Sequence, residues 1–218
     1  MKKIKSFALF AVAAVFLPLG ASCSQSQPEI TFGFIKLVLY QEGAGAVERF
    51  SFFIIPDDED GIENLDRLFL YHDREQLRWV LNHNDWISYT DFNGVTWIGT
   101  RSIALQDNMS LPRGAYRAVL VNLGGESSER TFHFDGGARF PFPALEISDG
   151  QFTVRSEWPV NRFVAHTIEG FYVTTIEVPA HTGLTSDLNL PSMVFSVALW
   201  AEDTERFTSA FTNVVPLN

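Results

Sequence analysis

The stretch Leu111–Phe134 reads LPRGAYRAVLVNLGGESSERTFHF, and it indicates the fold more clearly than any other part of the chain. From Tyr116 to Val121 the residues alternate between two sides of an extended chain, and Tyr, Ala and Leu share one side. This two-residue period is typical of a β-strand with one buried face. Gly124 and Gly125 then turn the chain, and Thr131–Phe134 returns as a second strand. The stretch therefore predicts a β-hairpin.

Strand-like segments also precede this hairpin. Ile30–Tyr40, Val47–Ile55 and Arg67–His72 are rich in Phe, Ile, Val, Leu and Tyr, and they are too short or too interrupted for amphipathic helices. The window Asp73–Asn82, DREQLRWVLN, fits either a helix or a strand, because each places several apolar residues on one face. We favour a strand there, since the neighbouring segments are strands.

Two further hairpins are signalled by their turns. Asn93-Gly94 in YTDFNGVTWIG and Asp149-Gly150 in ALEISDGQFTV each offer the two positive φ angles of a type I′ turn. Further along, Gly170–Val178 and Val194–Ala201 alternate well and are expected to pair across a sandwich. The absence of a strand–helix–strand alternation makes a doubly wound nucleotide-binding sheet an unsuitable interpretation.

The segment Asp135–Pro143, DGGARFPFP, divides the chain, because adjacent glycines followed by two prolines are typical of a linker. It predicts one β-sandwich over residues 30–135, a linker over 136–143 and a second β-sandwich over 144–218. The two parts hold about 105 and about 75 residues, and a module of about 100 residues is typical of a small sandwich.

The stretch Leu111–Phe134 resembles the closing hairpin of immunoglobulin-like and fibronectin type III-like modules. In such a module a tyrosine opens the penultimate strand and its hydroxyl bonds back to nearby backbone, and Tyr116 is the matching residue. The upstream FIIPDDEDGIENLDRLFLY, residues 53–71, resembles the second strand, acidic loop and third strand of the same modules. The resemblance implies an all-β fold of two tandem sandwiches of this kind.

The N-terminus has the layout of an export signal. Lysines near the start precede the apolar run Phe7–Leu19, which has about 13 residues where a membrane span needs about 20. Gly20, Ala21 and Ser22 then lead to Cys23, the only cysteine. This seam resembles the lipobox of bacterial lipoproteins, in the relaxed form found in spirochaetes.

The resemblance implies a signal peptide over residues 1–22, an acylated Cys23 and a tether over 23–29. The alternative is a plain secretory signal with Cys23 as a bystander, but a leftover thiol in an exported protein invites intermolecular pairing. Two or more acyl chains anchor a protein stably where one does not. Ser24 follows the cysteine in place of the aspartate that retains some lipoproteins, which favours an outer-membrane destination.

Charge restricts the partners. The chain carries 16 basic and 26 acidic residues, for a net charge of −10. Without the predicted signal peptide it has 13 basic and 26 acidic residues, and its net charge is −13. An acidic protein is unsuited to binding nucleic acid. We expect the membrane, through lipid, and a protein or glycan ligand as partners, and no cofactor.

Two groups of residues are candidate sites. Trp79, Trp86 and Trp97 lie close together in sequence, and exposed in a row they would stack on sugar faces or anchor a protein, whereas buried they are core. The acidic run holding Asp57, Asp58 and Asp60 is a weak calcium candidate, because Pro56 and Arg67 stand where the EF-hand pattern needs acids. A solvated loop is the alternative interpretation.

The chain shows no recognisable catalytic constellation: it lacks a G-x-S-x-G elbow, and its histidines are scattered. We therefore predict a lipid-anchored envelope protein that acts as a non-catalytic binding or structural module. The alternative is a carbohydrate-binding or carbohydrate-degrading surface protein that uses the three tryptophans.

Overall fold

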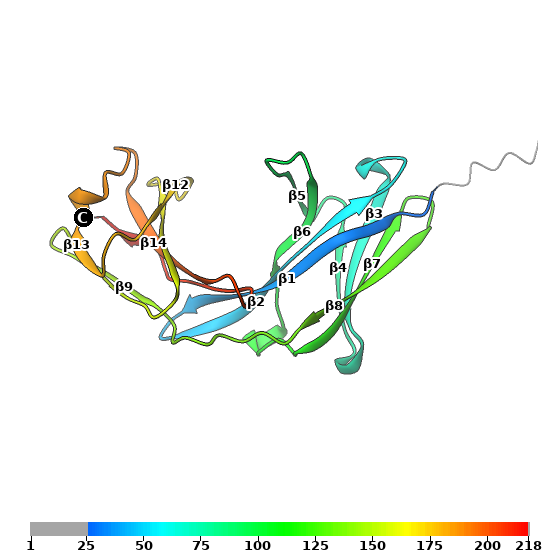
Figure 1. Cartoon of the computed structure of the whole chain (residues 1–218), viewed down its shortest axis with the longest axis horizontal. Coiled ribbons are helices and arrows are strands. Elements are labelled where there is room, and N and C mark those ends of the chain that lie inside the picture. Colours follow the sequence, from blue (N-terminus) through cyan, green and yellow to red (C-terminus); the bar gives the residue numbers. More distant parts are fainter. Residues whose placement is uncertain (1–25, 218) are drawn as a thin grey trace, which may run out of the picture.

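The structure is a computed structural model that describes residues 26–217, so the predicted signal peptide and Cys23 lie outside the described residues. β-strands make up most of the described chain, and they form three sheets (Figure 1). The prediction of an all-β sandwich fold is confirmed. Four short 3-10 helices connect strands: η1 (Ile62–Asn64), η2 (Asp73–Glu75), η3 (Gln106–Asn108) and η4 (Thr185–Leu188).

The first sandwich packs half of a large sheet against a four-stranded sheet. The large sheet contributes β1 (Glu29–Glu42), β2 (Gly45–Asp57), β6 (Thr96–Ile103) and β5 (Ile87–Thr90). The opposing sheet has the order β4 (Leu77–Asn82), β3 (Leu65–His72), β7 (Gly114–Asn122) and β8 (Ser127–Phe134). The window that fitted a helix or a strand is therefore a 3-10 turn followed by β4.

Aromatic side chains form the centre of the first core. Phe50 is fully buried, and its ring lies 5.5 Å from that of Tyr116 and 4.7 Å from that of Phe134. These contacts join β2 to the hairpin β7–β8. The Tyr116 hydroxyl donates a hydrogen bond of 2.6 Å to the carbonyl oxygen of Pro112, which is the predicted bond back to nearby backbone.

The second sandwich packs the other half of the large sheet against a three-stranded sheet. Here the large sheet contributes β12 (Tyr172–Glu177), β11 (Val160–His166), β14 (Ser196–Asp203) and β15 (Thr208–Phe211), and β16 (Val215–Pro216) pairs with β14. The opposing sheet has the order β13 (Thr182–Leu184), β10 (Gln151–Arg155) and β9 (Ala144–Ser148). A core around Phe152, Phe163 and Leu199 fills the space between them.

One expectation about this half is wrong. The segments Gly170–Val178 and Val194–Ala201 were expected to pair across the sandwich, but β12 and β14 lie in the same sheet, on either side of β11. Alternation shows that one face of a strand is buried, but it does not show which sheet holds the strand.

The two sandwiches share one continuous sheet of nine strands. They meet where β1 and β15 pair in parallel, from Leu37 opposite Thr208 to Tyr40 opposite Phe211. Residues 135–143 contain no strand, and Phe140 and Phe142 in this segment pack against Trp158. The domain boundaries at 136–143 stay a prediction, and the shared sheet is a connection that they did not include.

The turn predictions had different outcomes. Asp149 and Gly150 both have positive φ, at 51° and 72°, as a type I′ turn requires. At the other hairpin only Gly94 has positive φ, at 80°, and its amide donates to the carbonyl of Asp91 at 3.0 Å. The Asp91 carboxylate accepts hydrogen bonds from the amides of Asn93 and Val95, which stabilises this wider loop.

Among residues 26–217, no helix has the length and apolar character needed to cross a membrane.

Candidate functional site

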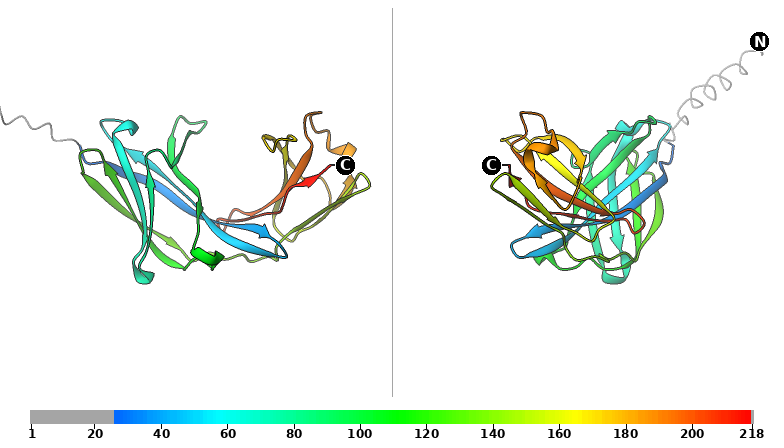
Figure 2. Two further views of the ribbon diagram at one scale, coloured as in Figure 1. Left: turned by 180° about the vertical axis from the view of Figure 1, so that it is seen from behind. Right: turned by 60° about the vertical axis from the view of Figure 1, so that its left-hand side comes forward.

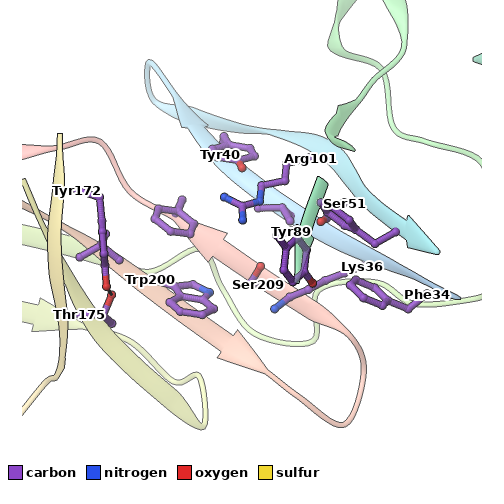
Figure 3. Close-up of a pocket in the computed structure, with 14 residues that line it drawn as sticks. Phe34, Lys36, Tyr40, Ser51, Tyr89, Arg101, Tyr172, Thr175, Trp200 and Ser209 are labelled. Atoms are coloured by element: carbon purple, nitrogen blue, oxygen red, sulfur yellow. Dashed lines mark hydrogen bonds between the residues drawn. The ribbon is translucent and has the colours of Figure 1, made fainter. Parts of the chain in front are cut away.

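A groove of about 470 Å³ lies on the face of the nine-stranded sheet that points away from both cores. β5 and β12 are the two end strands of this sheet, and Figures 1 and 2 show that they rise on either side of the groove. Figure 3 shows the side chains that line the groove, which are mostly aromatic or aliphatic: Phe34, Lys36, Val38, Tyr40, Ser51, Phe53, Tyr89, Arg101, Val164, Tyr172, Thr175, Trp200, Ser209 and Phe211.

Strand alternation divides residues between the cores and the groove. On β1, Leu37 points into the first core while Lys36 and Val38 line the groove. On β14, Leu199 points into the second core while Trp200 lines the groove. The shared sheet therefore carries apolar side chains on both faces, and within residues 26–217 no second sheet packs on the face that forms the groove.

Three aromatic rings form a row across the seam between the sandwiches. The rings of Tyr40 and Phe211 lie 6.0 Å apart with planes 21° apart, and those of Phe211 and Trp200 lie 5.9 Å apart with planes 14° apart. The strand register explains the row, because Phe211 is the direct partner of Tyr40 on β1 and of Trp200 on β14.

Cations flank the row at both ends. The Arg49 guanidinium lies 5.9 Å from the Tyr40 ring. Lys36 Nζ lies 5.4 Å and the Arg162 guanidinium 5.2 Å from the Trp200 ring. Both of these cations also pair with the Glu202 carboxylate, which Arg162 Nη1 approaches to 3.1 Å. One carboxylate thus faces two positive charges at this end of the row.

Arg101 is held by fewer side-chain contacts than Lys36, the other charged residue that lines the groove. It is exposed, and among the described residues it forms no ion pair and no hydrogen bond through its side chain. Figure 3 shows its guanidinium pointing into the groove near Tyr40 and Tyr89. Burial raises the pKa of both tyrosine hydroxyls, and the positive charge of Arg101 opposes that rise in each.

The structure does not bring the three predicted tryptophans into one row. Trp79 and Trp86 are half-buried and pack against the first core, and Trp79 Nε1 donates to the carbonyl of Ala104 at 2.9 Å. Trp97 lies on the other face of the large sheet, where its ring is 5.5 Å from Phe34. The separation arises because Trp79 faces the first core from β4, whereas Trp97 on β6 lies on the opposite face from its buried neighbour Ile98.

The acidic candidates are not assembled as a ligand set. The Asp58 carboxylate accepts hydrogen bonds from the Asp60 amide at 2.9 Å and from Asn64 Nδ2 at 3.2 Å, which holds the loop in shape. Asp57 is the last residue of β2. Within residues 26–217, no three His, Cys, Asp or Glu side chains are grouped so that they could hold a metal ion.

Sequence reasoning missed the groove residues Tyr40, Arg101, Trp200 and Phe211. A signal was present, because β1, β2 and β14 have apolar or aromatic residues on both faces. A second apolar face indicates either another packed layer or a binding surface. The alignment of these residues depends on the pairing of β1 with β15, which joins positions at opposite ends of the chain.

No family model matches this chain, and no curated protein matches it. Among solved structures it is similar to Tp47, the 47-kilodalton lipoprotein of Treponema pallidum, with a TM-score of 0.45, 12% identity and coverage of 86% of this chain and 50% of Tp47. Dimeric latent PorU from Porphyromonas gingivalis matches with a TM-score of 0.30 and 12% identity over 87% of this chain and 20% of PorU.

A third match is a chain from the crystal structure of Dpr11 IG1 bound to DIP-gamma IG+IG2, with a TM-score of 0.22, 14% identity and coverage of 86% of this chain and 100% of that one. This chain therefore spans about half the length of Tp47 and about a fifth of PorU.

Proposed function

We propose that this chain is a lipid-anchored protein of the bacterial cell envelope that binds a ligand in the groove of its nine-stranded sheet without transforming it. The groove lining is the observation that supports binding. A concave surface of roughly 300–1,000 Å³ with aromatic walls and a few polar groups is typical of ligand sites, and this groove encloses about 470 Å³.

The chemistry of the lining favours recognition over catalysis. Among the described residues that line the groove, the charged side chains are Lys36 and Arg101, and the polar ones are hydroxyls. Carboxylates and histidines, which most often transfer protons in enzymes, are not part of this set. Such a lining is suited to holding a ligand by ring contacts, hydroxyl hydrogen bonds and positive charge.

Attachment through Cys23 is compatible with an open groove. β1 begins at the far end of the first sandwich and runs toward the second, as Figure 1 shows. A lipid anchor just ahead of β1 would therefore attach the protein at the end opposite the second sandwich. We also propose that the lipid is inserted in the outer membrane, because Ser24 stands in place of the aspartate that retains some lipoproteins.

Carbohydrate binding, the alternative function predicted from the sequence, remains a second candidate. The aromatic rings that would contact the sugar are different from those predicted. Trp79 and Trp86 are packed against the first core. A saccharide would instead contact the groove rings, of which Tyr89 is 38% exposed and Tyr172 is 65% exposed.

The anchor is tested by replacing the acylated residue. We expect the Cys23→Ala protein to leave the detergent phase in a phase-separation assay and to collect as a soluble exported form or as precursor. The control is Ser24→Ala, which keeps the cysteine and should partition like the parent protein. If Cys23→Ala still enters the detergent phase, the lipid is not on Cys23.

The groove is tested with washed envelope fragments as the probe and the soluble Cys23→Ala protein as the ligand-binding partner. We expect saturable co-sedimentation that falls when Tyr89→Ala and Tyr172→Ala are combined, because both rings line the groove. The matched control combines Phe92→Ala and Leu123→Ala, which remove exposed apolar residues outside the groove. Equal binding by the two double variants, or no saturable binding, would contradict the proposal.

A further inference from the structure

We propose that the groove takes an acidic oligosaccharide, whose sugar rings lie against the aromatic side chains while its carboxylate or sulfate groups pair with Arg101 and Lys36. This inference rests on the proposed function and names the class of ligand that the groove binds.

The charge of the groove is opposite in sign to the net charge of the chain. The whole chain has a net charge of −10, yet both charged residues that line the groove, Lys36 and Arg101, are positive. An acidic protein repels anions over most of its surface, so a local positive charge in a concave site directs them there. A neutral ligand would gain hydrogen bonds but no charge–charge attraction from this arrangement.

The groove has more positive charge than its internal ion pairs neutralise. Glu202 pairs with both Lys36 and Arg162, so one negative charge faces two positive ones. Arg101 has no ion-pair partner among the described residues. The groove therefore keeps positive charge after its internal pairs are counted, and a planar guanidinium suits carboxylate or sulfate oxygens.

The backbone of the groove floor favours a saccharide over a peptide. β1, β2, β14 and β15 are each paired on both sides, so their backbone N–H and C=O groups are used in the sheet. An extended peptide commonly binds by adding a strand to a free sheet edge. The floor offers side chains only, and a saccharide can use these through its ring faces and its hydroxyls.

The hydroxyl groups of the groove are available for such contacts. The side chains of Tyr40, Ser51 and Tyr89 form no side-chain hydrogen bonds with other described residues. A hydroxyl both donates and accepts, as sugar hydroxyls do. Aromatic faces carry partial negative charge and attract the C–H groups on the face of a sugar ring.

The test uses the full-length Cys23→Ala protein and four short probes in isothermal titration calorimetry at low salt. The acidic glycans are an oligogalacturonate and a heparin oligosaccharide, the neutral glycan is a malto-oligosaccharide of matched length, and the peptide is oligoglutamate. We expect at least one acidic glycan to bind, and the neutral glycan and the peptide to bind at least about tenfold more weakly.

Arg101→Gln should weaken binding of the acidic glycan by about tenfold or more, because it removes a charge-assisted hydrogen bond. The matched control is Arg78→Gln, which removes the same charge from an exposed position on β4, outside the groove. Its affinity should equal that of the parent protein, and circular dichroism verifies that both variants are folded.

Several results would overturn the inference. If neither acidic glycan binds, or if Arg101→Gln and Arg78→Gln weaken binding equally, the groove does not recognise acidic saccharides. If oligoglutamate or the neutral glycan binds as well as the acidic glycans and loses affinity with the paired tyrosine variants, the ligand class is wrong while the groove remains a binding site. The separate result that contradicts the proposed function is an absence of saturable envelope binding in the co-sedimentation assay when both tyrosines are intact.

Discussion

In each sandwich one aromatic side chain donates a hydrogen bond to a proline carbonyl, but the two side chains lie in different surroundings. In the first sandwich the Tyr116 hydroxyl donates to Pro112 at 2.6 Å from within the core. In the second half Trp158 Nε1 donates to Pro141 at 2.8 Å. Trp158 does not belong to the core around Phe152, and it packs instead at the seam, against Ala201 and Ala210 of the shared sheet.

The difference shows how the two halves are stabilised. The first sandwich has an extensive core between its four-stranded sheet and its half of the shared sheet, in which Phe50 and Tyr116 are fully buried. The second has a smaller core and gains additional burial at the seam, where residues 140–142 cross over Trp158. A small module without disulfides buries a limited core, so packing against a neighbour supplies part of its stability.

The largest loss of stability is expected from a substitution in the first core. Phe50→Ala should lower the free energy of unfolding by about 3–5 kcal/mol, because it removes a fully buried ring and leaves a cavity. Since the halves share a sheet, we expect faster hydrogen exchange at the amides of β10 in the second sandwich as well as at those of β7. Exchange at β10 that stays at the parent rate would show that the sandwiches unfold independently.

A substitution at the seam should cause a smaller loss of stability, and the faster hydrogen exchange should appear in a different part of the molecule. Trp158→Phe removes the hydrogen bond to Pro141 and part of a ring that is 3% exposed, and should cost about 2–3 kcal/mol. We expect the faster exchange to concentrate in the second sandwich. The control is Trp86→Phe, a half-buried tryptophan of the first sandwich. Equal losses in urea denaturation would argue against a special role for the seam.

The smallest effect is expected at Tyr116. Tyr116→Phe keeps the ring and removes one hydrogen bond to a half-buried carbonyl, so it should cost about 1–2 kcal/mol. A loss near zero in urea denaturation at pH 8 would make Tyr116 an ordinary strand residue.

The parent protein and Tyr116→Phe should also differ in how their stability changes at alkaline pH. Burial raises the pKa of the Tyr116 hydroxyl above its ordinary value. This contribution to stability is complete below the unfolded pKa of about 10 and is lost as pH rises above it, by up to about 1.4 kcal/mol per pH unit. The parent should therefore lose stability more steeply than Tyr116→Phe between pH 10 and 11. Parallel losses would show that the hydroxyl does not resist ionisation.

Local sequence was sufficient for much of the fold. The alternation and the glycines in Leu111–Phe134 predicted the hairpin β7–β8, and the Asp149-Gly150 pair predicted the turn of the hairpin β9–β10. It was insufficient at Asn93-Gly94, because the Asp91 side chain accepts two backbone hydrogen bonds and stabilises a wider loop. A dipeptide preference is weaker than such a local network.

The candidate site was less predictable than the fold. Trp79, Trp86 and Trp97 are neighbours in sequence, yet the structure places them on different faces. Tyr40 and Phe211 are far apart in sequence, yet they are direct partners across β1 and β15. Proximity along the chain therefore did not predict which aromatic rings the fold brings together.

By itself the sequence determined that the described chain is built of strands and where two of its hairpins turn. These features follow from two-residue periodicity and from the φ angles that particular residues permit, and both are local properties. Only the tertiary structure decided that β15 pairs with β1, so that one sheet serves both sandwiches and one of its faces forms the groove. Strand pairing is a non-local choice among many edges with the same backbone chemistry, and it is set by how the complete molecule packs.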